Sequence, residues 1–415
     1  MRVLVLSQYY DPEPIAKPGE IASELVARGH HVEVLTGLPN YPTGSLAPGY
    51  RISLWRHEER ARVPILRVFE FPYHGTSGFG RLANYGSFAA SALLAGLRIS
   101  KPDVMYVWSP PLTVGLTAAA LSRFRDVPFV YDLQDIWPES LVFSGMSAES
   151  MVVRLMRLVE PRVYQSAGHI LVPTVGGRAN LETKGISASK VTVLPHWANP
   201  DDFVELDAAG RARSRAAMET MDFDFVVTYA GNIGFAQGLE QVVQAADTLR
   251  DNPRIKFRVI GDGAAIDGLK AEIATRHLTN VRLLGRRTRA ETASLLAASD
   301  LLLLTLRNQD LGRIALPGKV TSYLASGRPI LSGAGEGAGR LIESIGAGAI
   351  VEPGDPVGLG RRIVEMSERP PRALAAMGSS GRDYARSELS RGRLIDRLEV
   401  ILREVGKSPT RRRSG

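Results

Sequence analysis

One stretch of the sequence, residues 301–329, decides how the rest is interpreted. It reads LLLLTLRNQDLGRIALPGKVTSYLASGRP. The apolar run at residues 301–304 predicts a buried strand, and residues 320–325 predict a helix that Gly327 ends. The stretch is therefore a strand–loop–helix unit of the kind from which α/β folds are built.

The loop inside this stretch has the chemistry of an anion site. Pro317 and Gly318 form a turn before the helix, so the amide groups of the first helical turn are free to bind a ligand. Lys319 adds a positive charge beside them, and Asp310 and Arg313 lie in the polar loop before the turn. These features suit a diphosphate. The alternative is an ordinary strand–loop–helix unit with a solvated lysine.

The pattern of strands and helices begins twice, near residue 1 and again near residue 224. The chain has 415 residues, 44% of them hydrophobic, which suits two to three domains of ordinary size. We therefore predict two doubly wound, Rossmann-like α/β domains that face a central cleft. The predicted strands are residues 2–7, 31–36, 64–69, 103–108, 128–132, 169–174 and 190–194, and then 223–230, 255–260, 281–284, 301–305, 329–331 and 349–351.

The predicted domain boundaries follow from where this pattern breaks. The first domain is expected at residues 1–198, a linker at 199–222 and the second domain at 223–384. The helices of about residues 385–405 could pack back on the first domain, and residues 406–415 form a basic tail.

Positive charge is concentrated near the C-terminus. The formal net charge is +8, and Lys407, Arg411, Arg412 and Arg413 supply half of it. The tail is either a solvated end or a segment attracted to anionic lipid. The arginine-bearing amphipathic stretch at residues 151–164 could also lie on a membrane, although a core-facing helix is commoner. No basic stripe with interleaved aromatics is visible, so no nucleic-acid partner is expected.

Composition also excludes several classes of site. Cysteine is absent, which excludes disulfides, thiolate metal sites and a cysteine nucleophile. The histidines lack the spacing of a metal site, and Asp222-Phe223-Asp224 begins a strand instead of ending one, so no metal and no cofactor are expected. Neither a signal peptide nor a transmembrane helix is predicted. We expect a cytoplasmic protein. One interpretation of the basic tail is peripheral contact with the inner membrane face.

Glycine-rich loops follow three strands of the second half. GNIGFAQG occupies residues 231–238, GDG occupies residues 261–263, and Gly285-Arg286 ends the next strand. Glycines at such positions let the backbone approach a ligand, and parallel strands bring their loops to one sheet edge. A plain turn is the alternative for each loop alone. The spacing is not G-x-G-x-x-G, which counts against a dinucleotide-dependent enzyme.

In the first half, a strand ends in the sequence VYDLQDIWPES, residues 130–140. Asp132 and Asp135 would then lie at the carboxyl end of a strand, where α/β sheets bind ligands. The alternative is a helix cap by Asp135 and a core position for Trp137. The Pro/Gly-rich stretch at residues 37–50 predicts a long loop over the same edge.

Taken together, these pieces resemble the family-4 retaining glycosyltransferases of the GT-B fold. The closest branch is similar to bacterial enzymes that add amino sugars to lipid-linked glycans for capsule, O-antigen or exopolysaccharide. The matching pieces span most of the chain in the family's order: SQYYDPEP, LTGLPNYPTG, DLQDIWPES, VLPHWANPDDF, YAGNIGFAQGLE, VIGDG and PGKVTSYLASGRP.

The resemblance implies a nucleotide-diphosphate sugar donor, UDP-linked by expectation, bound mainly by the second domain without a metal. Lys319 and Arg313 would neutralise the leaving diphosphate. The residues implied in donor binding are Gly231, Asn232, Gly234, Gly261, Asp262, Gly263, Arg286, Pro317, Gly318 and Ser322.

The resemblance also implies an acceptor site in the first domain. Asp135 would lie in the active centre, as base or orienter for the acceptor hydroxyl. Tyr9, Tyr10, Asn40 and Tyr41 would bind the acceptor, which would be a polyprenyl-diphosphate-linked chain or another glycan.

Two departures from the family pattern keep alternatives open. The family often has two glutamates where this chain has Ile314 and Ser322, and a basic residue where it has Gln237. Asp310 is a possible substitute for one contact. The alternatives are a GT-B nucleotide-sugar 2-epimerase, which would need a cleft rich in His and Glu, and a non-catalytic scaffold that binds a nucleotide or a glycan.

Overall fold

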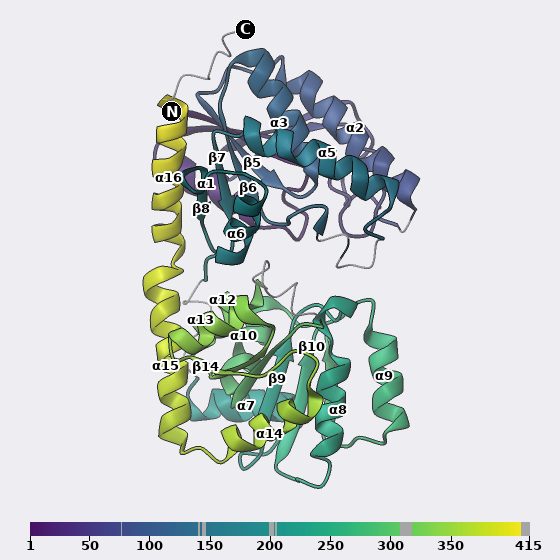
Figure 1. Cartoon of the computed structure of the whole chain (residues 1–415), viewed down its shortest axis with the longest axis vertical. Helices are drawn as coiled ribbons and strands as arrows, with labels where there is room; N and C mark the ends of the chain where they lie inside the picture. Colours follow the sequence, from purple (N-terminus) through teal and green to yellow (C-terminus); the bar gives the residue numbers. More distant parts are fainter. Residues whose placement is uncertain are drawn as a thin grey trace. The chain divides into compact units, whose positions relative to one another are not determined.

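The computed structural model describes residues 1–75, 77–139, 142, 147–198, 203, 206–307 and 318–407, and it divides into two compact units (Figure 1). Unit 1 contains Met1–Pro173, Arg178–Leu194 and the last helix from Ile395 onward. Unit 2 contains Thr174–Gly177 and Pro195–Leu394.

Unit 1 is built around a sheet whose described strands have the order β3-β4-β2-β1-β5-β6-β7-β8. All neighbours are parallel except the edge pair β3 and β4. The strands are β1 (Arg2–Ser7), β2 (His31–Gly37), β3 (Trp55–Arg60), β4 (Val63–Val68), β5 (Val104–Ser109), β6 (Phe129–Leu133), β7 (His169–Val172) and β8 (Val191–Val193).

Helices cover both faces of this sheet. Helices α2 (Gly78–Gly96), α3 (Leu112–Arg125) and α5 (Met151–Ser166) form one layer, with α3 in contact with both of the others. Helix α1 (Lys17–Ala27) and the second half of α16 (Arg391–Lys407) cover the opposite face, where Arg28 pairs with Asp396 at 3.0 Å (Figure 1). The remaining elements are α6 (Val175–Thr183) and the short helix η1 (Ala188–Lys190).

Unit 2 has a parallel sheet with the order β11-β10-β9-β12-β13-β14. Its strands are β9 (Phe225–Ala230), β10 (Ile255–Ile260), β11 (Val281–Gly285), β12 (Leu301–Thr305), β13 (Ile330–Gly333) and β14 (Gly348–Ile350). Its helices are α7 (Ala208–Ala217), η3 (Phe235–Gln237), α8 (Glu240–Thr248), α9 (Ile266–Thr275), α10 (Arg289–Ala298), α12 (Lys319–Ser326), α13 (Glu336–Ser344), α14 (Pro356–Ser367) and α15 (Pro371–Glu388).

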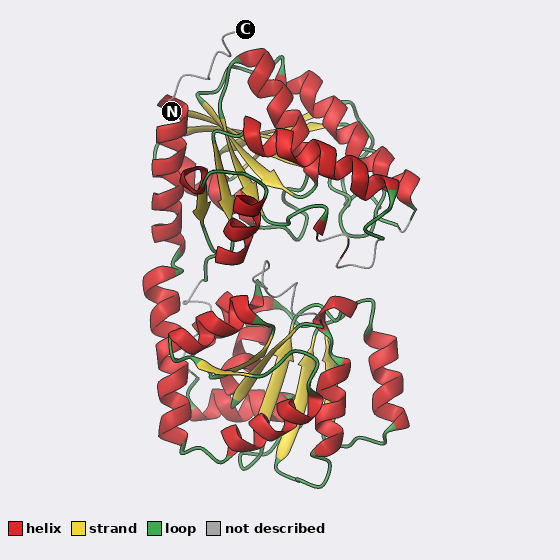
Figure 2. Cartoon of the chain, in the orientation of Figure 1, coloured by secondary structure: helices red, strands yellow, loops and turns green. Residues whose placement is uncertain are grey.

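The leucine run of β12 shows how this sheet is buried from both sides. Leu302 and Leu304 belong to one cluster of buried apolar side chains, whereas Leu301 and Leu303 belong to another. Because successive side chains of a strand point to opposite faces, a strand between two helical layers must be apolar at every position. Figure 2 shows helices on both sides of this sheet.

The predicted fold class is confirmed, and each predicted strand is present within a few residues of its expected bounds. Strand β3 was not predicted, because WRHEER is a polar edge strand without an apolar face. The predicted linker at 199–222 contains helix α7, whose Arg215 is buried and donates to the carbonyl of Ala298 at 3.0 Å. That buried hydrogen bond attaches much of the predicted linker to unit 2.

Strand order places one ligand-suited edge in each unit. The order reverses between β1 and β5 in unit 1, and between β9 and β12 in unit 2. Loops at the carboxyl ends of such strands diverge and leave room for a ligand. None of the described helices is both long and apolar enough to cross a membrane.

Candidate functional site

The glycine loops of unit 2 interlock at the carboxyl edge of the sheet. The amide of Gly231, after β9, donates to the carbonyl of Ile260 at 2.9 Å, and the amide of Ile233 donates to the carbonyl of Asp262 at 2.8 Å. The amide of Gly261, after β10, donates to the carbonyl of Gly285 at 2.9 Å. Three loops far apart in sequence therefore form one continuous backbone surface.

Two of these positions require glycine. Gly261 has φ of +141°, and a Cβ atom there would lie 1.9 Å from the carbonyl oxygen of Gly231. Gly263 has φ of +157°, and a Cβ there would lie 2.5 Å from Oδ1 of Asn232. Positive φ already strains other residues, and at these distances the loops would have to separate. The glycines thus allow the close backbone packing of this edge.

Lys319 lies over this surface as the first residue of α12. Its Nζ atom is 3.8 Å from the ring centroid of Tyr229 and donates a hydrogen bond to the Tyr229 hydroxyl. That hydroxyl in turn donates to the carbonyl of Asn232 at 2.7 Å. A Cβ on Gly231 would lie 3.1 Å from the ammonium, so the lysine is held beside the first glycine loop.

The charge of Lys319 is not compensated by the described part of the chain. No described carboxylate pairs with it, and the protein around the ammonium lowers the pKa of Lys319 to about 7. The pKa is low because burial disfavours the charged form of a lysine. An anion bound beside the ammonium would reverse this effect, and the first-turn amides of α12 would add their partial positive charge.

The other predicted donor residues lie around this centre in different ways. Asn232, Asp262, Arg286 and Gly318 are exposed, and Ser322 is half-buried one turn along α12 from Lys319. Gly234 directly precedes the short helix η3 as its N-cap. Arg313 and Pro317, together with Asp310 and Ile314, lie outside the described residues. Tyr229 was not predicted, because a tyrosine inside an apolar strand is more often a core residue.

Unit 1 has a different edge, dominated by aromatic rings. The ring of Tyr9, after β1, lies 5.2 Å from that of Tyr41, 5.9 Å from that of His74 and 6.4 Å from that of Trp108, by centroid distances. Tyr41 and His74 are in edge contact at 5.2 Å. The structure therefore brings the predicted Tyr9 and Tyr41 together and adds two rings that the sequence analysis missed.

A buried carboxylate, Glu13, fixes the loops that carry these rings. Its Oε1 accepts hydrogen bonds from the amides of Asn40 at 2.9 Å and Tyr41 at 2.8 Å. Its Oε2 accepts from the amide of Tyr10 at 3.0 Å. Burial raises the pKa of Glu13, and these three hydrogen bonds oppose that shift.

A second carboxyl group, Glu70, is fully buried beneath the same loops. Its Oε1 accepts from Nε2 of Gln8 at 2.8 Å, from Nδ2 of Asn40 at 2.9 Å and from Nδ2 of Asn84 at 2.7 Å. A Cβ on Gly37 would lie 1.8 Å from Oε2, so this oxygen packs against the backbone after β2. Burial raises the pKa of Glu70 to about 8.

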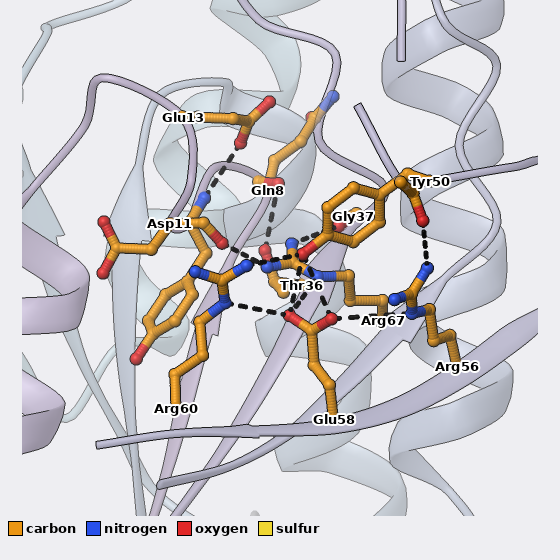
Figure 3. A network of polar contacts seen from close by, with 12 residues as sticks. Gln8, Asp11, Glu13, Thr36, Gly37, Tyr50, Arg56, Glu58, Arg60 and Arg67 are labelled. Atoms are coloured by element: carbon orange, nitrogen blue, oxygen red, sulfur yellow. Dashed lines mark hydrogen bonds and ion pairs between the residues drawn. The ribbon is translucent and has the colours of Figure 1, made fainter. Parts of the chain in front are cut away.

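Arg67, on β4, joins segments that follow or end neighbouring strands of unit 1 (Figure 3). Its buried guanidinium donates to Oε1 of Glu58 at 2.7 Å, to the carbonyl of Gly37 at 3.0 Å and to the carbonyl of Asp11. The predicted Tyr10 is buried close to this network, and burial raises its pKa to about 12. Tyr10 therefore does not join the aromatic cluster of Tyr9.

The two aspartates after β6 separate into different environments. Asp132 is fully buried and accepts from the hydroxyl of Tyr106, while Nζ of Lys17 lies 3.0 Å from its carboxylate. Asp135 is exposed, and desolvation by the surrounding protein raises the pKa of its carboxyl. Asp135 is thus the one that a ligand can reach.

Several buried polar atoms near the aromatic cluster have no hydrogen-bond partner within the described residues. These atoms are Gln8 Oε1, Asn40 Oδ1, His74 Nε2 and Trp108 Nε1. Buried polar groups normally find a partner, and a hydroxyl-rich ligand would supply both donors and acceptors. In the described parts of both units, no group of three His, Asp, Glu or Cys side chains is placed to hold a metal.

The fold is shared with solved glycosyltransferase structures. The sucrose-phosphate synthase of Thermosynechococcus elongatus superposes with a TM-score of 0.77 over 97% of this chain and 98% of that one, at 16% identity. Anabaena Alr3699/HepE, solved in complex with UDP and glucose, gives 0.71 over 97% and 100%, also at 16% identity. These similarities show that the chain has the GT-B fold.

Sequence comparison shows the family. The description "Glycosyl transferase 4-like domain" matches residues 18–197, and "Glycosyl transferases group 1" matches residues 224–369. The chain belongs to the glycosyltransferase family that combines these two domains. WcaI of Escherichia coli (strain K12), named as a colanic acid biosynthesis glycosyl transferase, is 28% identical over 85% of this chain and 89% of its own length. WbjE of Pseudomonas aeruginosa, named as a glycosyltransferase, is 27% identical over 74% and 76%.

Proposed function

We propose that this protein is a retaining, metal-independent glycosyltransferase of cell-surface polysaccharide synthesis. It would move a hexose or an N-acetylhexosamine type of sugar from a UDP-linked donor to a lipid-linked or other glycan acceptor. The donor would bind at the carboxyl edge of unit 2, and the acceptor at the carboxyl edge of unit 1.

The observation that carries the proposal is the ammonium of Lys319. It lies beside Gly231 at the start of a helix, and no described carboxylate neutralises it. When a sugar leaves a nucleotide diphosphate, negative charge develops on the diphosphate. A fixed cation and aligned amides can stabilise that charge without a metal ion. This assigns to Lys319 the role of neutralising the leaving group.

The names of similar proteins support the substrate class. WcaI is named for colanic acid biosynthesis, a polysaccharide pathway, which favours a glycan product. The Anabaena structure holds UDP and glucose, which favours UDP as the donor nucleotide. At 16% identity the similarity to the Anabaena structure concerns the fold, and the thermal-shift screen below tests the UDP assignment directly.

The chemistry of unit 1 suits a sugar acceptor. Aromatic rings bind the apolar faces of sugar rings, and the partly exposed ring of Tyr41 lies beside that of Tyr9 at this edge. Asp135 is exposed at the same edge, with a raised pKa. We propose that it orients the acceptor hydroxyl or receives its proton.

A thermal-shift screen against UDP, GDP, ADP and their sugars, with and without EDTA, tests the proposal. A ligand that binds only the folded protein stabilises it, by about 2.7 kcal/mol at a hundredfold excess over its dissociation constant. Stabilisation by UDP that EDTA does not change is expected.

Activity separates an enzyme from a scaffold. Purified protein is expected to release UDP slowly from the sugar that stabilises it, because water can replace the acceptor. Stabilisation by UDP without hydrolysis or transfer would favour the non-catalytic scaffold. Conversion of the free nucleotide sugar into its 2-epimer would favour the epimerase.

A further inference from the structure

Helix α5 of unit 1 has an apolar face that points away from the core. Val153, Val163 and Tyr164 are buried on its inner side. Met151, Leu155 and Leu158 recur at helical spacing on the opposite side, with exposed fractions of 85%, 61% and 65%. A soluble helix normally carries polar residues there, so this outer stripe needs a reason other than folding.

Helix α2, in the same layer, has a similar outer stripe. Its inner side packs Asn84, Phe88 and Ala92 into the core. The opposite side carries Phe79 and Leu82, which are 82% and 67% exposed, and continues toward Leu94 and the residue after the helix, Leu97. The two helices flank α3, so their outer stripes belong to one surface (Figure 1).

The charges of this surface are almost all positive. Helices α2, α3 and α5 contain six arginines and one acidic residue, Glu160. Glu160 is buried and pairs with Lys184 at 2.8 Å, so it does not offset the arginines at the surface. Arg154 and Arg157 flank the outer stripe of α5, and no described carboxylate pairs with either of them. The six arginines are Arg81, Arg123, Arg125, Arg154, Arg157 and Arg162.

The topology places this layer next to the proposed acceptor site of the same unit. Each of the three helices follows a strand of a parallel sheet and runs back along it, so its N-terminus lies at the carboxyl edge. Phe79, Leu82 and Met151 are therefore at the end of the layer nearest Asp135 and the aromatic cluster.

We propose that the outer surface of α2, α3 and α5 docks on an anionic lipid bilayer. Exposed leucine, methionine and phenylalanine would enter the boundary between head groups and acyl chains, and the arginines would contact the phosphates. The role that we give to this docking rests on the proposed function, because docking would bring unit 1 to a lipid-linked acceptor.

Vesicle sedimentation tests the docking independently of catalysis. The intact protein is expected to bind vesicles of phosphatidylglycerol and phosphatidylcholine, to bind phosphatidylcholine alone much less, and to dissociate as salt is raised. Leu155→Glu with Leu158→Glu is expected to weaken binding at least about tenfold, because two apolar contacts become repulsive charges. Arg154→Gln with Arg157→Gln is expected to weaken it by about thirtyfold, at roughly 1 kcal/mol per charge.

Matched controls separate this surface from general charge. Val357→Glu with Val400→Glu adds the same two charges at exposed positions on α14 and α16, and Arg361→Gln with Arg372→Gln removes two exposed arginines of unit 2. Both controls are expected to bind vesicles like the unchanged protein. All variants are expected to keep the melting temperature of the unchanged protein and its thermal shift with UDP. Absence of that shift in every protein, the unchanged one included, would refute the donor assignment without affecting the docking result.

Three results would overturn the proposal. The first is vesicle binding by the Leu155/Leu158 variant as tight as that of the unchanged protein. The second is loss of binding on deletion of residues 408–415 while the leucine variant still binds, which would assign the contact to the basic tail. The third is a dimer in lipid-free solution that the leucine variant converts to monomer, which would make a second copy of the chain the occupant of this surface.

Discussion

The carboxyl edges of the two sheets share an architecture but differ in chemistry. In unit 2, the edge is made of glycine backbone and the ammonium of Lys319, which no described carboxylate neutralises. In unit 1, the buried carboxyl groups of Glu13 and Glu70 hold loops that carry the rings of Tyr9 and Tyr41. One edge suits an anion and the other a hydroxyl-rich ring.

The difference shows how one kind of fold presents two different chemistries at the carboxyl edge of its sheet. A strand order that reverses within the sheet opens a site in both units, and the loops decide what the site binds. The diphosphate site proposed in unit 2 needs few side chains, because backbone amides and one cation are sufficient to bind a phosphate. Unit 1 needs long loops with fixed rings, and the buried polar network provides the rigidity. The predictions below test whether this division holds.

The largest expected effect concerns the network that supports unit 1. Arg67→Met would remove the buried guanidinium that donates to Glu58 and to the carbonyls of Asp11 and Gly37, and we expect a loss of about 3 kcal/mol in the free energy of unfolding. Arg282→Met is the matched control, because Arg282 forms an exposed pair with Glu219 at 3.2 Å, worth about 1 kcal/mol or less. Calorimetry would check both. Equal losses in the two variants would contradict the support assigned to Arg67.

The second prediction concerns pH and Glu70. Its folded pKa of about 8 lies above the ordinary value of 4.5, so the folded state keeps a proton that the unfolded state releases. The stability that this proton contributes is complete below about pH 4.5 and is lost as pH rises through about 8. Glu70→Gln should remove most of this loss, as measured by urea unfolding across the same range. An unchanged pH profile would show that Glu70 is ionised in the folded protein.

The third prediction concerns the cation of unit 2. Lys319→Met should lower sugar transfer or donor hydrolysis at least about tenfold, because the leaving diphosphate loses its fixed positive charge. Lys270→Met is the control, since Lys270 is an exposed residue of α9 that pairs with Asp267 at 3.3 Å. Steady-state rates with the donor found in the screen would decide. A variant at position 319 with the unchanged rate would remove Lys319 from the active centre.

The smallest effect is expected for an aromatic residue of unit 1. Tyr41→Ala removes a partly exposed ring that contacts Tyr9 and His74, and we expect several-fold slower transfer to the acceptor. The UDP-induced thermal shift should stay within about 1 °C of the unchanged value, because a mutation in unit 1 leaves the UDP contacts of unit 2 intact and their stabilisation is set by ligand binding. A lower UDP affinity in this variant would contradict the assignment of the donor to unit 2 and the acceptor to unit 1.

The fold could be predicted well from the sequence, because most strands are short apolar runs that can be recognised locally. The second start of the α/β pattern near residue 224 and the glycine loops were visible at once, since short apolar strands and turn residues are local signals. Strand β3 was missed because its side chains are polar, and helix α7 because its buried residues include Arg215.

The site of unit 1 could be predicted only in part. Tyr9, Glu13 and Tyr41 belong to quoted motifs, although no role was predicted for Glu13, whereas Glu70, His74 and Trp108 come from separate loops and strands. Their roles depend on contacts between residues up to about a hundred positions apart, which no local pattern reports. In unit 2, Tyr229 looked like a core residue until the structure placed its hydroxyl between Lys319 and Asn232.

The most direct test of the account is the number of protons taken up when UDP binds. Calorimetric titration at about pH 8, in buffers that differ in ionisation enthalpy, would measure it for the unchanged protein and for Lys319→Met. Lys319 has a pKa of about 7 in the protein without ligand, so it is mostly neutral at about pH 8. A diphosphate bound beside it should raise that pKa, and the protein should take up close to one proton. The Lys319→Met variant should take up almost none and should bind UDP more weakly. Equal affinity and no proton uptake in both proteins would show that the diphosphate does not bind beside Lys319.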